Sequence, residues 1–189
     1  MLANLRALFV SLVDIMLLRR GPEHLPASPS LLAALVVLNL VLTGLAYHAL
    51  FLPLVPEAPA NWPLQLISGA LATLLWWRVA FQLARKSERF VQTMIAVVAT
   101  NTLTVPAMPL AAALLPYLPS KTGAEPAPAP AMLVLLMALI TLWVLAVLSR
   151  IVRSAFEWSW PVSIVFTVAS SIGPAILLTI IFGDPQKAA

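Results

Sequence analysis

The sequence predicts an all-α polytopic membrane protein in which five transmembrane helices follow an N-terminal interfacial amphipathic helix. Three observations predict this class: 61% of the 189 residues are hydrophobic, only 10% are charged, and the mean hydropathy is +0.98. A soluble domain usually carries about a quarter charged residues, so this chain cannot cover its surface with water-facing groups. The 17 prolines lie between long apolar runs, and they therefore indicate helix ends and not a disordered tail.

The first thirty residues are predicted to form a cytoplasmic interfacial helix and a turn. Residues 2–18 are mostly apolar but short for a span, and their polar side chains fall on one narrow face at helical spacing, which favours a helix lying in the membrane plane. These polar residues are Asn4, Ser11 and Asp14. Gly21 is expected to cap the end of this helix, and Pro22 to prevent its continuation. A spanning N-terminal helix is the alternative.

Five further segments are apolar enough to cross a hydrocarbon core about 30 Å thick, which needs roughly 20 residues of helix. They cover residues 31–54, 63–83, 90–115, 131–148 and 160–182. Helix is the expected form, because backbone polar groups in lipid must be satisfied within the segment. Residues 31–183 are thus predicted to form one transmembrane domain, and residues 184–189 a short outer tail.

The basic residues predict the direction of the spans, since short loops rich in Lys and Arg stay cytoplasmic. With the N-terminus inside, the inner side holds Arg6, Arg19, Arg20, Arg78, Arg85, Lys86, Arg89, Arg150 and Arg153, and the outer side holds Lys121 and Lys187. The stretch SRIVRSAFEW, residues 149–158, is then a basic inner loop. We expect a multi-pass protein of the bacterial inner (plasma) membrane, with a cytoplasmic N-terminus and a periplasmic C-terminus.

The inner basic residues are the candidates for contact with anionic lipid headgroups on the cytoplasmic face, where each contributes about 1 kcal/mol. These candidates are Arg19, Arg20, Arg78, Arg85, Lys86, Arg89, Arg150 and Arg153. Arg78 lies inside an apolar run, and its aliphatic stem is expected to extend to the headgroups.

Two spans combine prolines with hydroxyl or amide side chains, as broken helices do around transporter sites. The candidate residues for a small polar cavity or a helix kink are Thr100, Asn101, Thr102, Pro106, Ser170, Ser171 and Pro174. Kinks with interhelical hydrogen bonds, worth about 0.6 kcal/mol each, are the simpler interpretation.

Several function classes lose support from composition. The chain has no cysteine, and no Asp or Glu lies within a predicted span, so thiolate chemistry, proton coupling and intramembrane proteolysis lack their side chains. The basic residues do not interleave with aromatics on a polar face, so nucleic acid is not an expected partner. No catalytic residue, metal site or cofactor is predicted. A lipid-modifying enzyme would have to use surface groups, namely Asp14, His24, Glu88 and Glu157.

Two stretches resemble the Yip-domain family of Rab-interacting-type five-span membrane proteins. RKSERFVQTMIAVVATNTLTVPAMPLAAALLPYL is similar to the family's inner loop and third span, and LWVLAVLSRIVRSAFEWSWPVSIVFTVASSIGPAILL to its hairpin of fourth and fifth spans. The Asp-Leu-Tyr-Gly-Pro signature of eukaryotic members is absent, so no functional residue carries over. The resemblance implies a membrane protein that organises or binds partners and is not an enzyme.

The expected function is therefore non-catalytic: an integral inner-membrane protein that binds or organises other membrane proteins, or itself, through helix-helix contacts. The alternative is a small oligomeric transporter or channel that uses the kinked third and fifth spans.

Overall fold

The computed structural model describes residues 2–54, 61–117 and 128–182, and this part of the chain contains helices and no strand. The helices are α1 (Leu2–Met16), α2 (Pro29–Ala46), α3 (Trp62–Leu83), α4 (Phe90–Thr104), α5 (Met108–Leu114), α6 (Ala131–Phe156) and α7 (Trp160–Phe182). Short helical turns join them: η1 (Pro22–His24), η2 (Tyr47–Phe51), η3 (Ser87–Arg89), η4 (Val105–Ala107) and η5 (Leu115–Tyr117). The predicted all-α class is confirmed for these residues. The predicted outer tail, Lys121 and Lys187 lie outside them.

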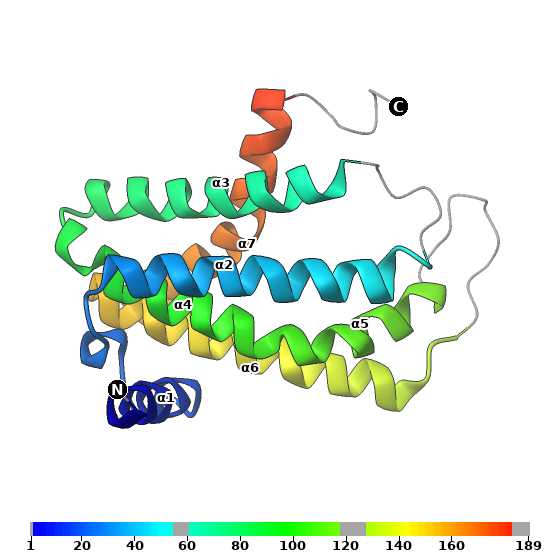
Figure 1. The fold of residues 1–189 in the computed structure, drawn as a ribbon, viewed down its shortest axis with the longest axis horizontal. Helices are drawn as coiled ribbons and strands as arrows, with labels where there is room; N and C mark the ends of the chain where they lie inside the picture. The colour runs from blue at the N-terminus through cyan, green and yellow to red at the C-terminus, as the bar shows by residue number, and fades with distance from the viewer. Residues whose placement is uncertain (1, 55–60, 118–127, 183–189) are drawn as a thin grey trace.

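Four helical segments are long and apolar enough to cross a membrane, namely Pro29–Phe51, Trp62–Leu83, Ser87–Tyr117 and Ala131–Phe156. They coincide with the first four predicted spans, and Figure 1 shows them side by side in alternating directions. α7 occupies the fifth predicted span but crosses behind α3 at a steep angle (Figure 1). Only its part Trp160–Pro174 qualifies as an apolar helix, and that part is short. The fifth crossing stays a prediction.

α1 lies at one end of the bundle, where Figure 1 shows it nearly end-on, so it runs across the direction of α2 to α6. It ends at Met16, and two residues later Leu18 has a left-handed φ of 60°, with a hydrogen bond from the Arg19 amide to the Asp14 carbonyl at 2.8 Å. This is the hydrogen-bond pattern of a Schellman motif, usually made by glycine. The expectation that Gly21 caps this helix is wrong: Gly21 has a φ of −104° and begins η1.

α2 starts at the same end, and its start follows from its sequence. The Ser28 hydroxyl accepts a hydrogen bond from the Leu31 amide at 3.3 Å, and Pro29 occupies the first helical position, where no amide donor is needed. The third predicted span is in fact two helices, because Pro106 within η4 separates α4 from α5.

α6 corrects one boundary of the sequence analysis. Residues 149–158 were expected to be a loop, but the helix continues to Phe156. Ile151, Val152 and Phe156 are buried in this extension, since their helical spacing turns them toward α4 and α7. The basic residues of this stretch therefore lie on a rigid helix.

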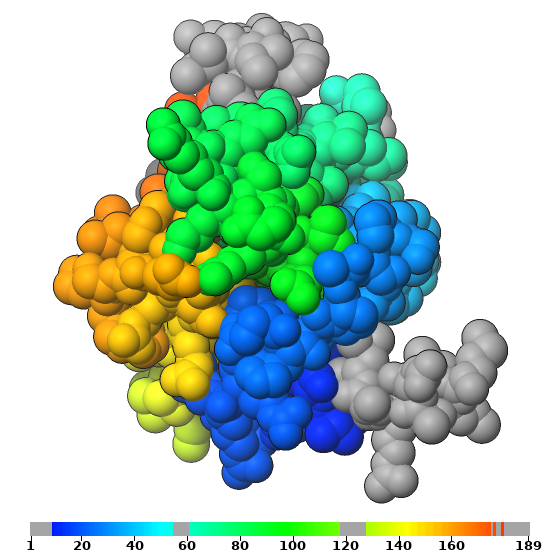
Figure 2. All heavy atoms as spheres, turned by 90° about the vertical axis from the view of Figure 1, so that its left-hand side faces the viewer, coloured from blue at the N-terminus to red at the C-terminus, as the bar shows by residue number. Residues whose placement is uncertain are grey.

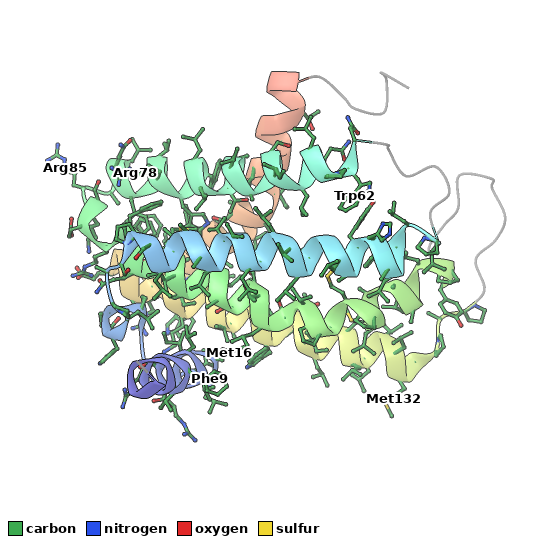
Figure 3. All side chains as sticks on the ribbon, viewed as in Figure 1. Phe9, Met16, Trp62, Arg78, Arg85 and Met132 are labelled. Atoms are coloured by element: carbon green, nitrogen blue, oxygen red, sulfur yellow. The ribbon has the colours of Figure 1, made fainter. Side chains whose placement is uncertain are left out.

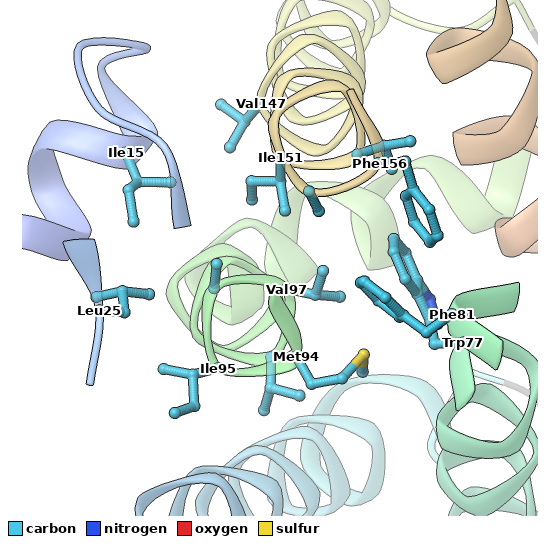
Figure 4. Packing of buried hydrophobic residues seen from close by; sticks show 14 residues of the cluster. Ile15, Leu25, Trp77, Phe81, Met94, Ile95, Val97, Val147, Ile151 and Phe156 are labelled. Carbon is cyan, nitrogen blue, oxygen red and sulfur yellow. The ribbon is translucent and has the colours of Figure 1, made fainter. Parts of the chain in front are cut away.

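The buried core lies in the half of the bundle nearest α1 and the C-terminal end of α6. Figure 4 shows Phe156 of α6 against Phe81 and Trp77 of α3, with Met94 and Val97 of α4 beneath them. The Phe81 and Phe156 rings stack with centroids 4.3 Å apart. α2 has no fully buried residue, so the packing loosens away from this core.

Candidate functional site at the basic end of the bundle

All eight predicted headgroup residues gather at one end of the bundle. Figure 3 labels Arg78 and Arg85 there, whereas Trp62 and Met132 lie at the opposite end. Figure 2 looks onto the basic end: blue atoms of the segment before α2, green atoms of the α3–α4 turn and orange atoms of the α6–α7 connection lie side by side. Three segments far apart in sequence thus form one polar surface, which we call the basic end.

Glu157 ties two of these segments together. It follows the last residue of α6 with a left-handed φ of 59°, and its carboxylate accepts from Lys86 Nζ at 2.6 Å and Arg89 Nη1 at 2.7 Å. Arg89 also donates to the carbonyls of Ser154 and Ala155 at 3.3 and 3.4 Å. Since the last carbonyls of a helix lack partners within it, Arg89 satisfies the end of α6 from the start of α4.

Glu23 fixes the third segment. The Ser154 hydroxyl donates to its carboxylate at 2.7 Å, and Gln92 Nε2 donates to the carbonyl of Leu25 at 2.8 Å. Gly21 lies against this contact: a Cβ there would collide with the Glu23 carboxylate and come within 2.6 Å of the Ser154 hydroxyl. A larger residue at position 21 would therefore have to displace the Glu23 carboxylate from the Ser154 hydroxyl, although the backbone conformation itself does not call for glycine.

The environment favours the ionised form of Glu23 and Glu157. Hydrogen bonds from Lys86 and Arg89 keep the pKa of Glu157 below its ordinary value of 4.5. For Glu23, burial opposes ionisation, but the Ser154 hydroxyl, a backbone hydrogen bond, His24 and Arg89 outweigh it and lower the pKa. A carboxylate with a lowered pKa stabilises the folded state above its unfolded pKa, and this contribution disappears as pH falls through the folded value.

We therefore expect the Glu157 contacts to stabilise the protein above about pH 4.5 and to be lost below it. The melting temperature of Glu157→Gln in a non-ionic detergent should lie below that of the parent at about pH 6, and the difference should shrink as the pH falls through the lowered pKa of Glu157. Glu88→Gln is the matched control, because Glu88 is exposed on the same turn and has no ion pair among the described residues. A pH-independent difference for Glu157→Gln would contradict the prediction.

A cavity of about 460 Å³ opens between the segment before α2 and the end of α6. Its walls carry both charge signs and one indole: they are formed by Gly21, Glu23, Arg150, Arg153, Ser154, Glu157 and Trp158. Trp158 stacks on Phe156 with ring centroids 4.4 Å apart, so this wall continues into the buried core.

The predicted headgroup residues fall into two groups. Besides Lys86 and Arg89, which pair with Glu157, three have a defined partner: Arg20 contacts Asp14 at 3.2 Å, and the guanidiniums of Arg78 and Arg153 lie over the rings of Phe90 and Trp160 at 5.3 and 5.2 Å, respectively. Arg19 and Arg85 are exposed, and Arg150 is half-buried. Arg78 lies at the basic end with its charge against an aromatic face, and its expected contact with lipid headgroups stays a prediction.

The residues predicted to line a polar cavity in the third and fifth spans are not gathered in one place. Thr100 and Thr102 donate to carbonyls of their own helix at 2.8 Å, and Ser171 donates to the Thr167 carbonyl at 3.1 Å. Ser170 accepts from Trp76 Nε1 at 3.0 Å. Asn101 contributes to a cavity of about 110 Å³ between α2, α3 and α4, to which α7 contributes no residue.

The two prolines of this set lie in different elements and differ in burial. Pro106 is exposed in η4, whereas Pro174 is buried inside α7. The simpler interpretation accounts for these hydrogen bonds: the threonine hydroxyls and that of Ser171 donate to carbonyls of their own helix, and Trp76 makes one interhelical bond to Ser170.

Sequence reasoning missed Glu23 and Ser154 as members of the basic end. Ser154 follows Arg150 by four residues, so a helix continued past Leu148 would have brought both to one face. Nothing in the sequence indicates the contact between Ser154 and Glu23, since 131 positions separate them. Among the described residues, no group of His, Asp and Glu side chains could hold a metal ion.

Comparison with protein-family models, with curated proteins and with solved structures finds no match to this chain. The resemblance to the Yip-domain family therefore stays a prediction.

Proposed function

We propose that this chain is a non-catalytic, multi-pass protein of a bacterial inner membrane, which organises another membrane protein or a second copy of itself through helix-helix contacts. Its basic end would face the cytoplasm and anionic lipid, in keeping with the positive-inside rule. The family resemblance carried by residues 85–118 and 142–178 favours the same role.

The observation that carries the proposal is the outer half of α6. In residues 131–144 only one stripe is even partly covered by the rest of the protein, and it consists of Leu133, Met137, Ile140 and Val144. The other faces carry large exposed apolar side chains, including Leu135 and Leu139 at 55% each. Helix association in lipid depends on packing, and this half-helix has most of its surface available for a partner helix.

Cysteine crosslinking in native membranes tests the proposal, and the chain has no cysteine of its own to interfere. We expect Leu139→Cys to give a discrete crosslinked species, because its face of α6 would meet the partner. Leu71→Cys is the matched control: Leu71 is 61% exposed, and lies nine positions after the start of α3, as Leu139 lies eight after the start of α6. It should stay uncrosslinked.

Equal crosslinking at both positions would indicate random collision in the membrane and would contradict the proposal. The absence of any crosslinked species at Leu139 and at neighbouring Leu135 would do the same. Mass spectrometry of the crosslinked species distinguishes a second copy of the chain from a different protein.

The transport alternative has weaker support, since Asn101 and Ser170 lie at different places in the bundle. It requires flux through purified protein in liposomes, and loss of that flux in Asn101→Leu.

A further inference from the structure

The cavity at the basic end has more basic side chains around it than carboxylates to pair with them. Four basic side chains surround it or back its walls, Lys86, Arg89, Arg150 and Arg153, against two carboxylates, Glu23 and Glu157. Because Lys86 and Arg89 already bind Glu157, and Ser154 binds Glu23, the two carboxylates are engaged. Arg150 and Arg153 remain as charges with no carboxylate in ion-pair distance among the described residues.

These two arginines are arranged to act together. They are three residues apart on α6, which places them on one face of the helix, and both line the cavity. Arg150 is half-buried, and the Arg153 guanidinium is held over the Trp160 ring at 5.2 Å. A guanidinium presents a planar fork of donors that matches the oxygens of a phosphate, so two guanidiniums that line one cavity suit one phosphate group.

The surroundings favour a lipid over a free ion. A volume of about 460 Å³ exceeds the need of one phosphate and falls in the range of small-molecule sites. α7 begins beside Arg153 and presents Val162 and Val165, which are 48% and 68% exposed and three positions apart on one face. An acyl chain lying along this apolar face would have its headgroup next to the cavity.

The depth of the cavity agrees with this arrangement. α6 has 26 residues, which at about 1.5 Å per residue make about 39 Å of helix, longer than a hydrocarbon core of about 30 Å. With the outer end of α6 at one interface, its last turns would reach the opposite headgroup layer, and Arg150 and Arg153 belong to those turns.

We propose that this cavity binds the phosphate group of an anionic phospholipid through Arg150 and Arg153, with Trp158 as its apolar wall. The inference rests on the proposed function only for the placement of the basic end at an anionic leaflet, and it does not depend on a partner protein.

The test is a titration of the purified full chain in non-ionic detergent, followed by native mass spectrometry, with phosphatidylglycerol, phosphatidylcholine of the same acyl chains, and inorganic phosphate as separate probes. Phosphatidylglycerol should bind in preference to the other two. In Arg150→Gln/Arg153→Gln we expect its dissociation constant to rise by about tenfold or more, since charge-assisted hydrogen bonds are lost. Arg19→Gln/Arg85→Gln removes the same charge from exposed positions outside the cavity, and it should raise the constant by clearly less than the variant inside the cavity.

Equal weakening in both double variants would show that only net charge matters, and it would overturn the site. Binding of inorganic phosphate as tight as that of the lipid would assign the cavity to a free anion, and no preference over phosphatidylcholine would exclude an anion site. The melting temperature without lipid reports folding. Should the double variant unfold, Arg153→Gln alone, at an exposed position, should raise the constant by about threefold. Loss of the lipid-binding result would not change the crosslinking expected at Leu139, so the experiments test the lipid site and the proposed function independently.

Discussion

Replacing Phe156 by alanine is expected to lower the free energy of unfolding by about 3 kcal/mol, the largest effect of any single change considered for this protein. The Phe156 side chain is 2% exposed, and its ring stacks on Phe81 at 4.3 Å and on Trp158 at 4.4 Å, with Phe166 at 5.5 Å. Its removal leaves a cavity where three helices meet. In a membrane the loss is mainly one of packing, so the lower end of the range for Phe→Ala applies.

Thermal unfolding in a mild detergent, followed by near-ultraviolet circular dichroism of the tryptophans, measures this effect. Phe9→Ala is the matched control, because Phe9 lies on α1 with its side chain 59% exposed. The melting temperature of this variant should stay close to that of the parent. A Phe156→Ala protein as stable as Phe9→Ala would mean that the aromatic cluster is not the core of the fold.

The second large effect is expected at Gly173 of α7. A Cβ at this position would lie 2.8 Å from the Trp76 ring, closer than side-chain atoms approach one another. Trp76 cannot move freely, because its indole donates to Ser170 at 3.0 Å. Gly173→Ala should therefore destabilise the protein by about 1–3 kcal/mol, as overpacked sites do.

Gly69 on α3 provides the opposite control. A Cβ there meets nothing within 4 Å, and glycine inside a helix is less favourable than alanine. Gly69→Ala should stabilise the protein by up to about 1 kcal/mol, so the two substitutions of the same type have opposite signs. The test is to measure the melting temperatures of Gly173→Ala and Gly69→Ala side by side. A shift of both variants in the same direction would contradict the close packing of α3 on α7.

The positions of the helices followed from the sequence because long apolar runs and prolines set them. The starts of α2 and α3 lie close to those of the predicted segments, since Pro29 and Pro63 lie in their first turns. The end of α6 does not follow from the sequence in this way, because its last turns carry the charged residues that usually mark a loop. Arg150 and Arg153 occupy helix positions whose neighbours are buried, and hydrophobic spacing was the better guide than charge.

The backbone conformations that follow three of the helices could not be predicted from the sequence either. Leu18, Arg85 and Glu157 adopt left-handed backbone conformations that usually call for glycine or asparagine. Contacts override the local preference: Lys86 and Arg89 hold Glu157, and the Lys86 amide donates to the Phe81 carbonyl at 3.0 Å. Such ends depend on tertiary packing, which composition and periodicity do not contain.

The sequence predicted which basic residues belong to the candidate site, but not which partners these residues have. Basic residues at one end of the bundle follow from the alternation of the helices. Their division into paired side chains, such as Lys86, and side chains without a carboxylate partner among the described residues, such as Arg150, required the structure.

The connection between α6 and α7 has only three residues, Glu157 to Ser159. So short a connection works as an elbow and not as a tether, and the backbone of Glu157 sets the direction in which α7 leaves the bundle. A tilt of α7 about this short connection would change the position of the Glu157 carboxylate relative to Lys86 and Arg89. The orientation of α7 and the ion pairs of the basic end are thereby mechanically coupled.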